Sequence, residues 1–156
     1  MTIKTENLIE LKPTDDMEYL LDLSDAYKYD VLSREKHKEL LKFYGKHFWN
    51  IYDNGVKMGV IFTQYIPALH WTVDGYTDSN YDGAIKRRVT VAIDAMKMVT
   101  QFLLDNVTDV IRTTHSKKNK AADKICKRAG YFFLMELESE IGTHNIFEYR
   151  RQSNGN

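Results

Sequence analysis

The sequence has few of the features that would suggest a secreted, metal-binding or membrane protein. It contains one cysteine, Cys126, so it cannot form an intrachain disulfide, and no Cys/His cluster has the spacing of zinc ligands. It has no apolar run of about 18 residues, and its N-terminus lacks a basic region followed by an apolar stretch. We therefore expect no membrane-spanning helix, no signal peptide and no metal site, and we expect a cytoplasmic protein.

The sequence also lacks net charge, because 22 Lys and Arg residues balance 22 Asp and Glu residues. Such a chain has no general field that attracts nucleic acid or an anionic membrane, so its partners must be inferred from local features. At 156 residues and 43% hydrophobic composition it is long enough for one core. We predict a single domain over residues 1–151 and a flexible tail over residues 152–156.

The clearest local pattern lies between residues 110 and 137 and is typical of a strand, a helix and a second strand. The β-branched run at residues 110–114 predicts the first strand, and apolar residues at helical spacing predict a basic helix over residues 117–128. Gly130 is expected to end that helix in the left-handed conformation, which glycine adopts without strain. The apolar run Tyr131–Met135 predicts the strand that follows.

Hydrophobic periodicity and turn residues predict the remaining elements. The strongest hairpin signal is Asn54-Gly55, since this pair supplies the positive φ angles of a tight turn. The other predicted elements are a strand at 8–11, a helix capped by Thr14, a helix from Ser33 to Tyr44 with Phe43 facing inward, strands at 48–52, 56–66 and 68–76, a long helix at 85–104, and a last strand at 146–149.

The pattern between residues 110 and 137 also resembles a known family. A strand, a loop with Asn119, a short helix with the small residue Ala122, and then Arg-Ala-Gly-Tyr before a strand is similar to the C-terminal half of the GNAT superfamily, the Gcn5-related N-acetyltransferases. Members often read N-x-x-A/S followed by K-x-G-F/Y. The resemblance implies an α+β protein with the GNAT acyl-CoA N-acyltransferase fold, in which a central mixed, mostly antiparallel sheet has the order β-α-α-β-β-β-α-β-α-β-β. The predicted elements follow that order along nearly the full chain.

The start of the predicted long helix, KRRVTVAIDAMKM, carries the second part of the resemblance. In the superfamily this place holds Q/R-x-x-G-x-G/A, where backbone N–H groups at a helix N-terminus grip the coenzyme A pyrophosphate. Arg87 takes the Q/R place, Thr90 the first glycine and Ala92 the last small residue, and the run from Ala92 resembles the A-T-E-A-L of the ribosomal-protein N-acetyltransferase branch. The resemblance implies acetyl-CoA as co-substrate, bound by Arg87, Arg88, Val89, Thr90, Val91, Ala92, Asn119 and Ala122.

Each motif also has a plainer interpretation. The basic residues at the helix start can be a solvated cluster, and Asn119 can serve as an ordinary residue of a helix start. Thr90 departs from the family pattern, because a side chain there could crowd the phosphates or add a hydrogen bond to them. Cys126 stands where many relatives place a tyrosine that protonates the leaving thiolate, and we interpret it as core packing, since buried thiols behave as small hydrophobes.

Acetyl transfer to an amine needs a general base and a hydrogen-bond donor for the thioester oxygen. In relatives that donor is a backbone N–H on the strand before the long helix, which is the predicted strand at 68–76. Asp74 is the best-placed carboxylate on that strand and is our candidate base, with His70 and His115 as weaker candidates.

Two classes of function therefore stay open. The leading prediction is an acetyl-CoA-dependent N-acetyltransferase that acts on a primary amine of a small molecule or a protein. The alternative is a catalytically degenerate GNAT-fold binding or assembly protein, for example one encoded by a virus, which the residues Thr90 and Cys126 favour. Nucleic-acid binding through the basic helix is disfavoured by the zero net charge, no membrane partner is expected, and a homodimer is compatible with the sequence.

Overall fold

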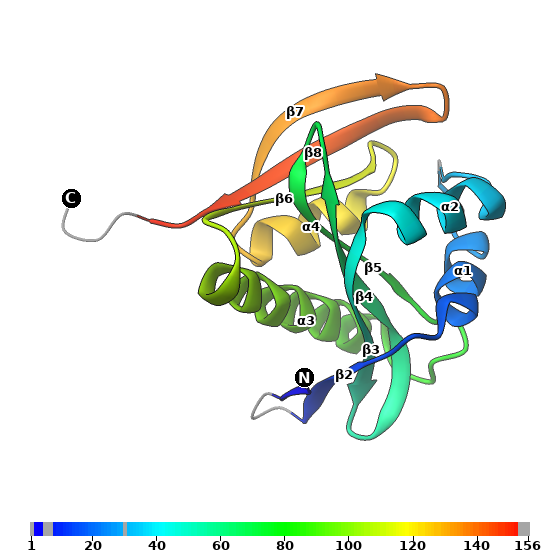
Figure 1. Ribbon diagram of the computed structural model, residues 1–156. Helices are drawn as coiled ribbons and strands as arrows, with labels where there is room; N and C mark the ends of the chain where they lie inside the picture. Colours follow the sequence, from blue (N-terminus) through cyan, green and yellow to red (C-terminus); the bar gives the residue numbers. More distant parts are fainter. Residues whose placement is uncertain (1, 5–7, 30, 153–156) are drawn as a thin grey trace.

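One mixed sheet runs through the protein and carries helices on both faces (Figure 1). The computed structural model describes residues 2–4, 8–29 and 31–152. Within these ranges the sheet has eight strands in the order β1-β2-β3-β4-β5-β6-β8-β7. The strands are β1 (Ile3–Lys4), β2 (Ile9–Pro13), β3 (Gly45–Asp53), β4 (Val56–Ile66), β5 (His70–Thr77), β6 (Val110–Ser116), β7 (Phe132–Ser139) and β8 (Gly142–Arg150). The helices are α1 (Met17–Asp25), α2 (Arg34–Tyr44), α3 (Ile85–Asn106) and α4 (Lys120–Arg128).

The predicted fold class is confirmed, because the elements from β2 onward follow the expected order and the sheet is mixed and mostly antiparallel. The short β1, which pairs antiparallel with β2, was not predicted. Only β5 and β6 pair in parallel among the described strands, and they come from either side of α3 in the sequence. The predicted tail lies mostly outside the described residues, which end at residue 152.

Two apolar clusters hold the layers together. In Figure 1, α1 and α2 lie on one side of the sheet, and α3 and α4 lie on the other. Val91, Ala95, Val99 and Leu103 recur at helical spacing on α3 and are fully buried against the sheet. The smaller cluster packs α1 and α2 against Val60 and Phe62, together with leucines of both helices. Strand β4 is therefore buried on both faces, which explains its nearly continuous apolar sequence.

The turn and helix-end predictions that depend on glycine are confirmed. Asn54 and Gly55 have φ angles of 51° and 80° between β3 and β4, as the Asn-Gly signal predicts. Gly130 has a φ of 94°; its N–H donates to the Lys127 carbonyl, and the Tyr131 N–H donates to the Cys126 carbonyl. These two bonds are those of a Schellman helix end.

Three predictions of helix boundaries or facing were wrong, and the last strand, Gly142–Arg150, is longer than the predicted 146–149. Helix α4 begins at Lys120 and not at residue 117, because the Asn119 side chain caps it. Asp16, and not Thr14, caps α1, and the Thr14 hydroxyl instead accepts from the Asp16 N–H. Phe43 is 77% exposed, although its helix buries Leu41 as expected.

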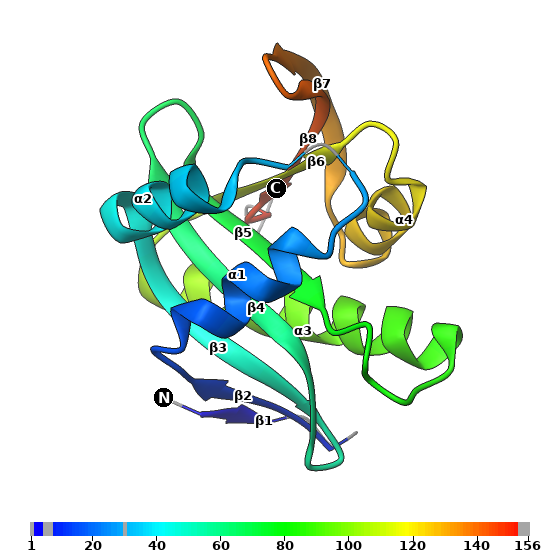
Figure 2. The same ribbon diagram turned by 90° about the vertical axis from the view of Figure 1, so that its right-hand side faces the viewer.

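The hairpin of β7 and β8 projects beyond the helices (Figure 2). All eight residues of β7 are exposed, including the apolar run that predicted a strand. Within the described part of the chain, no helix combines the length and apolar character needed to cross a membrane.

Candidate active site

The parallel strands β5 and β6 separate soon after they meet. Thr72 opposite Arg112 is their one paired position in the described residues. Beyond it, the ends of the two strands line cavities instead of pairing with each other. The parallel pair therefore splays apart near Asp74.

The separation directs a backbone donor of β5 toward the gap. Successive N–H groups of a strand point to opposite sides. The Asp78 N–H donates to the Met58 carbonyl on the β4 side, and the β4–β5 register continues without a shift to His70. The N–H of Gly75 therefore points away from β4, toward the side where β6 has separated from β5. The structure thus provides a donor of the kind that a thioester oxygen needs.

The first cavity, called the α4 cavity here, has a volume of about 430 Å³ and lies between α3, α4 and the splayed strands. Its walls include Ile85, Arg88, Val89 and Ala92 from the start of α3. From α4 and its cap come Asn119, Ala121, Ala122, Ile125 and Cys126. The lining is mainly apolar, with Arg88 at the end nearest the N-terminus of α3.

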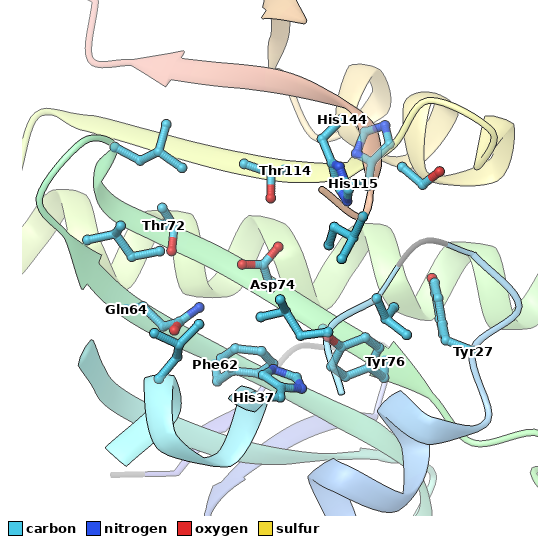
Figure 3. Close-up of a pocket in the computed structure, with 18 of the residues that line it drawn as sticks. Tyr27, His37, Phe62, Gln64, Thr72, Asp74, Tyr76, Thr114, His115 and His144 are labelled. Carbon is cyan, nitrogen blue, oxygen red and sulfur yellow. The ribbon is translucent and has the colours of Figure 1, made fainter. Parts of the chain in front are cut away.

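The second cavity, called the α2 cavity here, has a volume of about 280 Å³ and lies on the opposite side of the splayed strands. It is enclosed by the segment after α1, by α2, by strands β4, β5 and β6, and by the turn between β7 and β8. Figure 3 shows its labelled side chains around Asp74. Tyr27, Asp74, Gly75, Tyr76 and His115 line both cavities, so the two cavities meet at the gap between β5 and β6.

Asp74 lies at this junction, as the candidate base should. Its carboxylate accepts from the Thr113 hydroxyl at 3.5 Å and from the Thr114 N–H. Burial raises the pKa of Asp74 to about 7, and these two hydrogen bonds only partly oppose the effect. A carboxyl group with that pKa can accept and release a proton near neutral pH, which suits a general base. Its role in catalysis stays a prediction.

His115 lies at the same junction but is held by other partners. Its Nε2 donates to Asp123 Oδ1 at 2.6 Å, because a carboxylate can only accept. Asn145 Nδ2 donates to the same oxygen at 3.1 Å. Burial lowers the pKa of His115, so the ring is neutral at neutral pH and its Nδ1 is an acceptor. Cys126 Sγ lies 3.9 Å from that nitrogen.

Cys126 is buried, as the core-packing interpretation requires. Burial also raises the pKa of its thiol to about 12, with the nearby carboxylates of Asp74 and Asp123 acting in the same direction. A thiol with that pKa is a poor proton donor to a leaving thiolate. His70, the other weak candidate, stacks on Tyr65 and is not part of the lining of either cavity.

The two arginines at the start of α3 have different surroundings. Arg87 turns to β3, where its Nε donates to Asp53 Oδ2 at 3.0 Å and its Nη2 to Oδ1 at 2.5 Å. The Arg87 guanidinium holds the pKa of Asp53 below its usual range, and Tyr81 donates to the same carboxylate. Arg88 lines the α4 cavity, and among the described residues its buried Nε has no hydrogen-bond partner. Of the two, only Arg88 is placed to meet a ligand there.

The predicted use of backbone N–H groups from Val89 to Ala92 needs correction. Helix α3 begins at Ile85, and the Arg88 N–H already donates to the Ala84 carbonyl. The later N–H groups are therefore inside the helical ladder, and the groups left for an anion belong to the first turn. Ala84 provides no side-chain cap to that turn, and the turn has no acidic residue.

The side chains of residues 89–92 also differ in their surroundings. Val89 and Ala92 line the α4 cavity, whereas Val91 is buried in the core. The Thr90 hydroxyl is exposed and donates to the Lys86 carbonyl at 2.9 Å, so it does not crowd the cavity. Whether any of these residues contacts a ligand stays a prediction.

Asn119 and Ala122 lie together at the start of α4. Asn119 Oδ1 accepts from the Ala122 N–H at 3.1 Å, and Asn119 Nδ2 donates to the Tyr27 hydroxyl at 3.1 Å. The side chain is almost fully buried and caps the helix, as the plainer interpretation states, while also lining the α4 cavity. Ala122 lines it as well, so the small residue leaves space beside the helix.

The sequence analysis missed Tyr27, Thr72 and Gln64, which also line the α2 cavity. The alternation of β5 could have indicated Thr72, since it shares a face with Asp74. No local signal indicates Tyr27, which reaches Asn119 from 92 positions away in the sequence. Among the described residues, no group of three or more His, Cys, Asp or Glu side chains could hold a metal ion.

The arrangement defines a class of fold: a mixed sheet whose parallel pair splays around a cavity next to a helix N-terminus. Solved structures have a similar overall fold at low sequence identity. They include a GNAT-family acetyltransferase from Bacillus anthracis (TM-score 0.68, 13% identity, 96% of this chain and 98% of that chain). The aminoglycoside acetyltransferase AAC(6')-Ib, in complex with coenzyme A, has a TM-score of 0.71 at 13% identity, over 92% of this chain and 95% of that chain.

A third similar structure is the ribosomal L7/L12 alpha-N-protein acetyltransferase RimL in complex with coenzyme A. It has a TM-score of 0.67 at 13% identity, over 97% of this chain and 98% of that chain. By sequence, no protein-family model and no curated protein matches the chain. The fold is therefore that of the GNAT acetyltransferases, as the resemblance implied.

Proposed function

We propose that this protein is an acetyl-CoA-dependent N-acetyltransferase that acetylates a primary amine. The observation that carries the proposal is the gap between β5 and β6, which opens one cavity on each side of Asp74. Such an arrangement lets two substrates approach one carboxylate from opposite sides. The α4 cavity would take acetyl-CoA and the α2 cavity the amine.

The residues of the α4 cavity fit acetyl-CoA. Val89, Ala92 and Ile125 give apolar walls for the pantetheine arm, and Ala122 leaves room beside α4. Arg88 brings a positive charge and a buried N–H with no partner among the described residues. It directly follows the uncapped first turn of α3, where a phosphate would also meet the positive end of the helix dipole.

The chain's own groups can serve each step. When bound, acetyl-CoA supplies an activated acetyl thioester. The Gly75 N–H would donate to the thioester oxygen, because it points into the gap between the strands. Asp74 would accept the proton of the amine, directly or through one water, since its pKa of about 7 lets it take up a proton near neutral pH.

Tyr27 is the candidate donor to the leaving thiolate, in place of the tyrosine that Cys126 replaces. Its hydroxyl oxygen already accepts from Asn119, so its own hydrogen can be directed to another acceptor. Burial raises the pKa of Tyr27 and keeps the phenol protonated before transfer, while the hydrogen bond from Asn119 stabilises the phenolate and partly opposes this effect. Tyr27 lines both cavities, as a donor at their junction must.

The test is a transfer assay together with a binding measurement. Calorimetry should detect acetyl-CoA binding, and release of free coenzyme A should depend on an added primary amine. Asp74→Asn should lower kcat/KM by roughly 10²-fold or more, the usual effect of losing a general base, while acetyl-CoA affinity stays within a few fold. A wild-type protein that does not bind acetyl-CoA would contradict the proposal and favour a non-catalytic binding role.

A further inference from the structure

The charge pattern of the α2 cavity limits what can enter it. Asp74 is the one acidic side chain in the lining that the structure describes, and no Lys or Arg lines the cavity there. A second ammonium on a substrate would lose water without gaining a carboxylate. A substrate carboxylate or phosphate would likewise meet no lysine or arginine among the described lining residues.

Three histidines, His37, His115 and His144, also line the cavity. Burial lowers the pKa of His37 and of His115, so both rings are neutral at neutral pH. His37 shares a hydrogen bond with the Ser24 hydroxyl, and His115 donates to Asp123. The cavity therefore suits a substrate with one positive charge, placed at Asp74.

Aromatic rings form much of the remaining wall. Tyr27 packs edge-to-face against Tyr76 with ring centroids 5.2 Å apart, and Phe62 lies 6.0 Å from Tyr76. Tyr29 and Tyr44 also line the cavity. Ring edges and faces of this kind pack well against a flat apolar body.

One buried polar atom of the cavity lining has no hydrogen-bond partner among the described residues. Thr72 is 1% exposed, and its Oγ1 makes no hydrogen bond in the described part of the chain. Figure 3 shows Thr72 on the same strand as Asp74, with Gln64 beside it. Thr72 and Asp74 share one face of β5 and are two positions apart, roughly 6–7 Å along the strand. A buried hydroxyl at this distance calls for an uncharged polar group on the substrate.

We propose that the α2 cavity binds a primary monoamine whose body is an aromatic ring with one hydroxyl group, an arylalkylamine of the tyramine type. The amine would lie at Asp74, the ring among the tyrosines, and the hydroxyl at Thr72. This assignment rests on the proposed function, because it names the acceptor of that same site. It disfavours polyamines, aminoglycosides, free amino acids and peptide N-termini as acceptors.

The first experiment compares acceptors at a fixed acetyl-CoA concentration. We expect kcat/KM for tyramine to exceed that for 2-phenylethylamine by about tenfold, the effect of one buried hydrogen bond. Spermidine, kanamycin, glutamate and an alanyl peptide should be poorer still than 2-phenylethylamine. A higher kcat/KM for any of these four than for tyramine overturns the inference.

The second experiment removes the hydroxyl of the cavity while keeping its shape. In Thr72→Val, the tyramine to 2-phenylethylamine ratio should fall from about ten to about one, because the ring hydroxyl loses its partner. Both rates are measured on the same preparation of the variant, so a general loss of activity or of folded protein cancels in the ratio. An unchanged ratio in this variant overturns the assignment of Thr72.

Calorimetry with tyramine in the presence of coenzyme A separates the two proposals. Tyramine binding without transfer supports the inference and overturns the proposed function. Transfer to other amines, with no tyramine binding, overturns the inference and leaves the acetyltransferase proposal standing.

Discussion

Asp74→Asn should change how the stability of the protein depends on pH. The wild-type carboxyl group has a folded-state pKa of about 7 because burial disfavours its charged form. In the unfolded chain the same group is in water with an ordinary pKa. Folding therefore opposes ionisation of Asp74, and asparagine removes that ionisation without a large change in shape.

The sign follows from the number of bound protons. Between the unfolded pKa and the folded pKa, the folded protein holds a proton that the unfolded chain has lost, so the stability of the wild type falls as pH rises through this window. The shift from 3.8 to about 7 is roughly three units, which at 1.36 kcal/mol per unit corresponds to about 4 kcal/mol. Because Asp74 is only partly buried and borders two cavities that water can enter, we expect about 2–4 kcal/mol.

The assay is urea unfolding of both proteins from about pH 4 to about pH 9, with the free energy of unfolding compared at each pH. Other groups also titrate in this range. Burial lowers the pKa of His37 and His115, so they destabilise the protein as pH falls below the ordinary histidine value. Their effect is common to both proteins and cancels in the difference. Asp82→Asn, at an exposed carboxyl group, is the matched control.

The variant should gain stability relative to the wild type as pH rises, with most of the gain complete by about pH 8. A difference that stays constant over the whole range would refute the reasoning, because it would mean that Asp74 ionises equally well in the folded and unfolded states. Asp74 would then not be a base with a pKa near neutral pH. A difference of the opposite sign would mean that the folded protein stabilises the charged carboxylate.

Three further predictions concern other parts of the structure. Arg88→Ala should weaken acetyl-CoA binding, measured by calorimetry, by about 1.5–3 kcal/mol. The control Lys86→Ala removes the same charge from an exposed side chain outside the cavity and should leave the affinity nearly unchanged. Equal effects of the two substitutions would assign the loss to net charge alone. Gly130→Ala should lower the free energy of unfolding by about 1–2 kcal/mol, because its φ of 94° is strained for any residue with a Cβ, and an unaltered urea midpoint would contradict this. Leu103→Ala should destabilise by about 2–5 kcal/mol, since Leu103 is fully buried between α3 and the sheet; a loss below about 1 kcal/mol would show that the core collapses around the gap.

Local sequence signals were reliable where one or two neighbouring residues determine the backbone conformation. Asn54-Gly55 predicted its hairpin and Gly130 predicted its helix end, because both depend on φ angles that few residues adopt. The element order was also readable, since hydrophobic periodicity reports which face of each segment is buried. Asp74 could be placed on the correct strand for the same reason.

The details of the site could not be read in this way. Arg87 and Arg88 are adjacent in the sequence, yet consecutive helix positions point about 100° apart. Arg87 donates to Asp53, which is 34 positions away, while Arg88 faces the α4 cavity. Asn119 fitted both a helix cap and a ligand contact, and only the folded chain shows that it caps α4 and also ties Tyr27 to the cavity.

The sequence by itself determined most of the elements and their order, because these follow from propensities and patterns within short segments, and the resemblance to the GNAT superfamily indicated Asp74 as the candidate base. Tertiary structure decided where the sheet opens, which side chains line each cavity, and that burial brings the pKa of Asp74 to about 7. Loss of water around a carboxyl group depends on every element packed near it. The α2 cavity is built from both ends of the chain, so no single segment of the sequence encodes its chemistry.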